Sequence, residues 1–149
     1  MKRAELTDLI MEAKRTKGLS WKTICAKISP KASPVLITAA LLGQMPLEKA
    51  EAQKAEKLLG LPKGSASLLA AIPYRGSLPS VPPTDPTIYR FYELIQVYGP
   101  TWKELIHDEF GDGIMSAIDF EMKMERLPDP KGDRVKITMS GKFLPYKRY

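Results

Sequence analysis

Five prolines crowd the middle of the chain, and they limit its fold more than any other feature. They are Pro73, Pro79, Pro82, Pro83 and Pro86. Proline has a fixed φ and no backbone N–H, so it can neither continue a helix nor join a central strand. We therefore predict an extended linker over 77–86, with one domain at 1–76 and a second at 87–149.

The first domain is predicted to consist of short helices. Apolar residues at positions 6, 9, 10 and 13 share one face of a helix over 5–16. Further helices are expected over 21–28, 34–42, 46–59 and 65–72. Ser20 and Ser33 are suitable N-caps, and Pro34 suits the first turn after Ser33. With a break at 29–33, this order is typical of a helix-turn-helix domain of the phage-repressor type.

The second domain is predicted to be a small α+β unit. Asp85 as N-cap and Pro86 at the first helical position begin a helix that we expect to end at Tyr98, before Gly99 and Pro100. Another helix is expected from Thr101 to about Phe110. Two alternating segments, typical of strands, then flank a turn at 129–133. Their apolar positions are Phe120, Met122, Met124, Val135, Ile137 and Met139.

Two strands are too few to be stable alone, because one face and both edges need cover. The preceding helices could cover one face. The open edges invite pairing with another copy of the chain. We therefore predict strands that pair between subunits and an obligate homo-oligomer.

The positive charge is concentrated in the first domain. Residues 1–76 contain thirteen Lys/Arg and six Asp/Glu, a net +7, whereas residues 77–149 contain ten and eleven, a net −1. A basic domain attracts nucleic acid or small anions, or simply aids solubility. Charge alone does not choose between these.

A sequence-specific DNA contact is not expected. Reading base edges requires Arg, Lys, Asn or Gln on the recognition helix. The corresponding segment, 34–42, offers only Thr38 among apolar residues, so it should be buried in a core or a subunit interface. Nonspecific phosphate binding through the N-terminal lysines stays an open alternative.

The composition also argues against several other classes. Cys25 and His107 are the only residues of their kinds, so an intrachain disulfide is impossible and a protein-built zinc site improbable. The sequence contains no run of about eighteen apolar residues, so a membrane span is not expected. The N-terminus lacks the apolar core of a secretory signal. We expect a cytoplasmic protein without metal or organic cofactor.

Arg90 and Glu93 are the first candidates for chemistry. They are three residues apart, so their side chains can meet on the helix. Most such pairs are structural ion pairs on a surface. However, Arg before Glu is the less favourable order against the helix dipole, and aromatic neighbours predict burial. A buried arginine requires an anionic partner, either Glu93 or a bound anion.

Ser116 is the third candidate. The commonest role of a serine soon after glycines is in a turn or cap. A nucleophilic serine would need a nearby base, and the only histidine, His107, is given no role here. We therefore expect Ser116 to donate a hydrogen bond to a bound anion rather than to form an acyl-enzyme.

Two long motifs resemble those of the cyanase (cyanate hydratase, cyanate lyase) family. The first includes Asp85-Pro86-Thr87 and Tyr89-Arg90-Phe91-Tyr92-Glu93, followed by Val97-Tyr98-Gly99. The second includes Phe110-Gly111-Asp112-Gly113-Ile114 and Ser116-Ala117-Ile118. Shorter matches lie at 38–44 and 141–145.

The resemblance implies a lyase that converts cyanate and bicarbonate to ammonia and carbon dioxide, without metal or organic cofactor. It implies catalytic roles for Arg90, Glu93 and Ser116. It also implies a homodecamer of five dimers with sites formed where subunits meet, acting in cyanate detoxification and nitrogen metabolism. The alternative is a helix-turn-helix regulator that uses a cyanase-like domain only to oligomerise.

Overall fold

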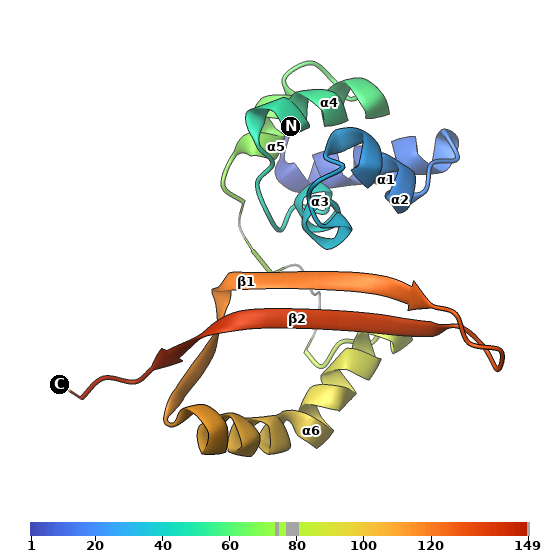
Figure 1. Ribbon diagram of the computed structural model, residues 1–149. Coiled ribbons are helices and arrows are strands. Elements are labelled where there is room, and N and C mark those ends of the chain that lie inside the picture. Colours follow the sequence, from blue (N-terminus) through green and yellow to red (C-terminus); the bar gives the residue numbers. More distant parts are fainter. Residues whose placement is uncertain (74, 77–80, 149) are drawn as a thin grey trace. The chain divides into compact units, whose positions relative to one another are not determined.

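The computed structural model describes residues 1–73, 75–76 and 81–148 (Figure 1). The chain divides into two compact units, one of residues 1–76 with 122–138 and one of residues 77–121 with 139–149. The elements in order are α1 (Arg3–Thr16), α2 (Trp21–Ile28), α3 (Pro34–Leu41), α4 (Lys49–Leu59), α5 (Ser65–Ala70), α6 (Pro86–Phe110), β1 (Gly113–Leu127) and β2 (Arg134–Pro145). The predicted α+β class is confirmed.

The five N-terminal helices start near where the sequence predicts. Ser20 Oγ accepts the N–H of Thr23 at 3.0 Å, and Ser33 Oγ accepts that of Val35 at 3.3 Å, so both predicted N-caps are confirmed. Helix α4 begins at Lys49, three residues later than predicted. Glu48 is its N-cap, and the Glu51 carboxylate accepts the Glu48 N–H.

A single apolar core holds these helices together. Its fully buried larger side chains include Leu6, Ile10, Ile24, Ile28, Ile37, Leu41, Leu59 and Leu69. Cys25 is buried among them, as an apolar residue would be. Within a helix, buried residues lie three or four positions apart, and this spacing in the sequence is what predicted the helical bundle.

Arg3 ties three helices of this bundle together. Its guanidinium donates to the Ala40 carbonyl of α3 at 2.6 Å and to the Leu68 carbonyl of α5 at 3.1 Å. Both acceptors lie near helix C-termini, where carbonyls lack helical partners and the dipole favours a cation. Burial lowers the pKa of Arg3, but an arginine stays charged at neutral pH.

Helix α6 is continuous, so the predicted break at Gly99–Pro100 is wrong. The helix begins as expected: Asp85 Oδ1 accepts the N–H groups of Thr87 and Ile88 at 2.9 and 3.0 Å. Pro100 lies inside it. Proline removes one N–H and crowds the preceding turn, which bends a helix without always ending it. Gly111, with φ of 89°, ends the helix in a conformation that favours glycine.

β1 and β2 form a two-stranded sheet joined by the predicted turn, in which the Gly132 N–H donates to the Asp129 carbonyl at 2.9 Å. The two strands of one chain thus pair with each other, and pairing between subunits stays a prediction. β1 starts at Gly113, so Ser116, for which a turn or cap is the commonest alternative role, lies within a strand. Part of the predicted linker, residues 77–80, lies outside the described residues. No helix in the described part of the chain is long and apolar enough to span a membrane.

Candidate active site

Arg90 and Glu93 meet directly on α6. The distance from Arg90 Nη1 to Glu93 Oε2 is 2.5 Å, and the contact is both a hydrogen bond and an ion pair. The Asp85 cap one turn earlier fixes the start of this helix, and hence the direction in which both side chains leave it. The guanidinium has five N–H donors, so a single partner leaves others available to an anion.

This ion pair is open to solvent in the single chain. The side chains of Arg90 and Glu93 are 70% and 44% exposed, and no described residue of α6 is buried. The predicted burial of this helix is therefore wrong for one chain. Large apolar side chains along α6 remain uncovered, among them Phe91, Leu94, Ile95, Val97, Tyr98, Trp102, Leu105 and Phe110. A two-stranded hairpin is too small to cover them, so the sequence pattern of a buried helix is not satisfied within one chain.

Ser116 has the opposite environment. It is 4% exposed, and its Oγ accepts the N–H groups of Ile118 at 3.0 Å and Asp119 at 2.9 Å. A serine oxygen has two lone pairs and one proton. Both lone pairs are occupied, so the hydroxyl is left as a donor and is poorly suited to act as a nucleophile.

A bulge in β1 creates these two backbone contacts. A β-carbon built on Gly141 of β2 would meet the Ser116 carbonyl oxygen and would also lie 3.3 Å from Phe120 Cδ2. Gly141 of β2 therefore lies against both the Ser116 backbone and the Phe120 ring. The N–H groups of Ile118 and Asp119, between these two residues, are directed to Ser116 Oγ, which indicates that β1 is bulged here. Ile118 at the tip of the bulge is 97% exposed.

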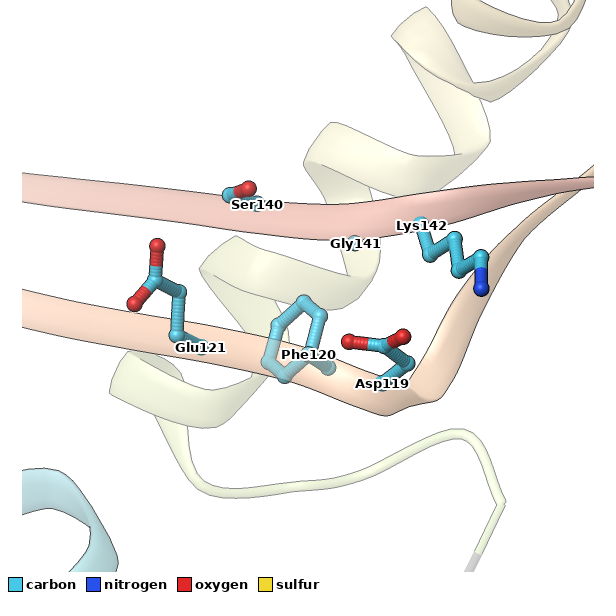
Figure 2. Close-up of a pocket in the computed structure, with 6 residues that line it drawn as sticks. All are labelled: Asp119, Phe120, Glu121, Ser140, Gly141 and Lys142. Carbon is cyan, nitrogen blue, oxygen red and sulfur yellow. The ribbon is translucent and has the colours of Figure 1, made fainter.

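A pocket of about 440 Å³ lies beside the bulge, where β1 bends sharply next to Asp119 (Figure 2). Its lining residues are Asp119, Phe120, Glu121, Ser140, Gly141 and Lys142. None of the three predicted site residues is among them. Two carboxylates against one lysine make this an unfavourable place for a free anion.

A second pocket, of about 430 Å³, lies between the C-terminal half of α6 and the first residues of β1. Trp102, His107, Asp112 and Tyr146 are among its lining residues. The Tyr146 N–H donates to the Asp112 carbonyl at 3.1 Å, and the rings of Phe110 and Phe143 stack nearby with centroids 5.3 Å apart. The His107 side chain makes no hydrogen bond to another described residue.

One chain thus brings two of the three predicted residues together. Arg90 and Glu93 form a pair, whereas Ser116 is bonded within its own strand and has no described hydrogen bond to either of them. Sequence reasoning missed the part played by Gly141, although a glycine inside an alternating strand pattern signals a bulge or a close backbone approach. Among the described residues, no three His, Cys, Asp or Glu side chains gather in a way that could hold a metal ion.

Comparison with known proteins decides the family. The model of the cyanate hydratase N-terminal domain matches residues 3–73, and that of the cyanate lyase C-terminal domain matches residues 80–148. The chain is 58% identical to the cyanate hydratase of Ralstonia pickettii (strain 12J) and 56% identical to that of Cupriavidus necator (strain H16). Both alignments span 149 residues and all of either chain.

The chain belongs to the cyanate hydratase family.

A solved cyanate hydratase shares its fold. The crystal structure of cyanase from T. urticae superposes with a TM-score of 0.77 at 38% sequence identity, covering 94% of this chain and 96% of that one. The resemblance drawn from the two motifs is confirmed, and the protein is an enzyme of the lyase class. Since the N-terminal helices match as a cyanate hydratase domain too, the comparison favours the enzyme over the regulator.

Proposed function

We propose that this cyanate hydratase decomposes cyanate with bicarbonate as a co-substrate. A bicarbonate oxygen attacks the cyanate carbon, and the adduct loses carbon dioxide to leave carbamate. Carbamate then breaks down to ammonia and a second carbon dioxide. Overall, one cyanate, one bicarbonate and two protons give one ammonia and two carbon dioxide molecules. Full-length identity of 58% to a cyanate hydratase, with Arg90, Glu93 and Ser116 at the positions of the family motifs, supports this proposal most strongly.

The central difficulty of this reaction is electrostatic. Two anions held about 4 Å apart repel each other by roughly 4 kcal/mol at an effective dielectric constant of 20. Arg90 supplies a permanent positive charge and planar donors for their oxygens. Its exposed guanidinium is bound to a single carboxylate among the described residues and has donors left for this role.

Ser116 supplies a directed hydrogen bond. Because its lone pairs are occupied by the Ile118 and Asp119 N–H groups, its proton is free for an anionic acceptor. A fixed donor that faces developing negative charge stabilises a transition state without reorganisation. The nucleophile arrives with the substrate, so the chain needs no base beside the serine.

Glu93 orients Arg90 in this proposal. The 2.5 Å ion pair restricts the guanidinium to one direction on α6. A proton-carrying role for Glu93 is the alternative, and it would require the carboxylate to be covered from solvent.

We further propose that the working enzyme is a cytoplasmic homo-oligomer, a decamer of five dimers. The uncovered apolar face of α6 and the open edges of the hairpin support association, because such surfaces are rarely left exposed to water. Strand pairing between subunits and sites shared by several chains belong to the same proposal, as does a division into domains at 1–76 and 87–149. No metal or organic cofactor is required.

Specific DNA binding has little support in the helical bundle. Thr38, the one polar residue of the would-be recognition helix α3, has its Oγ1 3.4 Å from the buried Cys25 Sγ. It therefore faces the neighbouring helix rather than a groove of DNA.

Carbon stoichiometry tests the proposed chemistry. With ¹³C-bicarbonate and unlabelled cyanate, membrane-inlet mass spectrometry should detect equal initial amounts of labelled and unlabelled carbon dioxide for each ammonia released. Attack by water instead of bicarbonate would give one unlabelled carbon dioxide per ammonia and would refute the proposal.

A further inference from the structure

We propose that Gly141 is a positioning residue for catalysis, because it sets the location of the Ser116 hydroxyl. This inference rests on the proposed role of Ser116 as a hydrogen-bond donor. Gly141 lies on β2 and touches no reacting atom in this proposal. It acts through the bulge at residues 116–120 on the neighbouring strand.

The requirement for glycine at position 141 is one of space. Gly141 does not have a positive φ, so its backbone could be adopted by any residue. A β-carbon there would collide with the Ser116 carbonyl oxygen and would lie only 2.7 Å from Met115 Cγ. The first of these atoms belongs to the backbone, so a rotamer change cannot relieve the collision.

The bulge depends on this close approach. The Ser116 carbonyl and the Phe120 ring both lie against this glycine. Within the bulge, the N–H groups of Ile118 and Asp119 are directed to Ser116 Oγ, which is their protein acceptor. The hydroxyl oxygen is held by two bonds from within the bulge, while the bulge is held against Gly141.

This arrangement links the shape of the sheet to the direction of the hydroxyl proton. Any side chain at position 141 would push the Ser116 carbonyl away from β2, and the bulge would move with it. Both bonds to Oγ would then change in length or angle. A displacement of about 1 Å at a catalytic group can reduce a rate about 100-fold. Arg90 is on α6, so the anion-binding charge would be unaffected.

The test is the steady-state kinetics of Gly141→Ala beside two controls. Ser140→Ala changes the adjacent exposed residue. Gly113→Ala introduces a comparable collision in the same sheet, with Leu144 O and the Phe143 ring, but not with Ser116. We expect kcat of Gly141→Ala to fall about 10- to 100-fold with KM for cyanate changed less than about threefold. Ser140→Ala should stay near wild type, and Gly113→Ala should lose less kcat than Gly141→Ala at an equal change in unfolding midpoint.

The outcomes separate this inference from the proposed function. If wild type shows bicarbonate-dependent turnover and Ser116→Ala does not, a Gly141→Ala enzyme with wild-type kcat overturns the positioning role alone. Equal kcat losses in Gly141→Ala and Gly113→Ala at equal midpoint changes would also overturn it. If wild type needs no bicarbonate, the proposed function fails first.

Hydrogen exchange keeps the inference testable should Gly141→Ala fail to assemble. In the assembled wild-type enzyme, the Ile118 and Asp119 amides should be protected, and Ser116→Ala should lose protection at these two amides selectively. Rapid exchange of both amides in the wild-type assembly would contradict the geometry on which the positioning role depends.

Discussion

The carbonyl oxygen of Ser116 occupies the space into which a side chain at Gly141 would project. A candidate catalytic residue on β1 is thereby positioned by the absence of a side chain on β2. The Oγ of the same serine accepts two N–H groups of the bulge. Ser116 therefore has a structural role in the sheet as well as its proposed role as a hydrogen-bond donor in catalysis. The two roles can be separated by measurement, because one affects stability and the other turnover.

Arg90→Leu is expected to reduce turnover about 100- to 1,000-fold, the usual effect of removing one donor to developing negative charge. Stability should change by about 0.5 kcal/mol or less, because the pair with Glu93 is an exposed helical ion pair. Ammonia release and urea unfolding measure the two effects. Near-normal turnover of Arg90→Leu would remove this residue from the site.

Arg15 provides the matched control. It pairs with Glu12 on α1 with the same three-residue spacing and the same 2.5 Å contact, and both side chains are well exposed. Arg15→Leu should therefore resemble Arg90→Leu in stability while keeping wild-type turnover. A comparable loss of turnover in both variants would point to a general effect of charge rather than to a site.

Glu93→Gln separates orientation from proton transfer. Glutamine still accepts a hydrogen bond from Arg90, so an orienting Glu93 predicts that Glu93→Gln keeps more activity than Glu93→Ala. The pH profile of kcat should then keep its shape. Equal inactivity of both variants, together with loss of one limb of the profile, would assign a proton to Glu93 instead.

Ser116→Ala should reduce both stability and turnover. The substitution removes the protein acceptor of the Ile118 and Asp119 N–H groups, and each lost hydrogen bond should cost about 0.5–1.5 kcal/mol. Urea unfolding gives this loss, and kcat is measured at a temperature where the variant is fully assembled. A stable variant with intact turnover would exclude both roles.

Arg3→Lys should destabilise the N-terminal bundle by about 1–3 kcal/mol. A single ammonium cannot reproduce the fork with which the guanidinium reaches both Ala40 and Leu68 carbonyls. Turnover of the assembled enzyme should be unchanged, because the residue lies outside the proposed site. Arg15→Lys, at an exposed position, is the control, and equal stability of the two variants would contradict this role for Arg3.

Helix starts were the part of the fold most accessible from sequence. Ser20, Ser33 and Asp85 each act as the cap that was predicted, because capping depends on a few neighbouring residues. The helix end predicted at Gly99–Pro100 was wrong, because the effect of Pro100 depends on whether the surrounding helix can bend around a missing N–H. Local rules decide the first case and tertiary context the second.

The candidate site was accessible only in part. The spacing of Arg90 and Glu93 predicts their contact, and the structure confirms it. Their predicted burial fails because aromatic neighbours can be covered by other subunits as well as by the same chain. Gly141 within the strand pattern signals a close backbone approach, but the sequence does not say which residue of β1 approaches it, because that depends on the register of the two strands.

The dependence of ammonia release on bicarbonate tests the central claim most directly. The enzyme is freed of dissolved carbon dioxide and bicarbonate, supplied with cyanate, and then given bicarbonate in increments. We predict negligible ammonia before the first addition and a saturating rise afterwards. Full-rate ammonia release in the absence of bicarbonate would contradict the account.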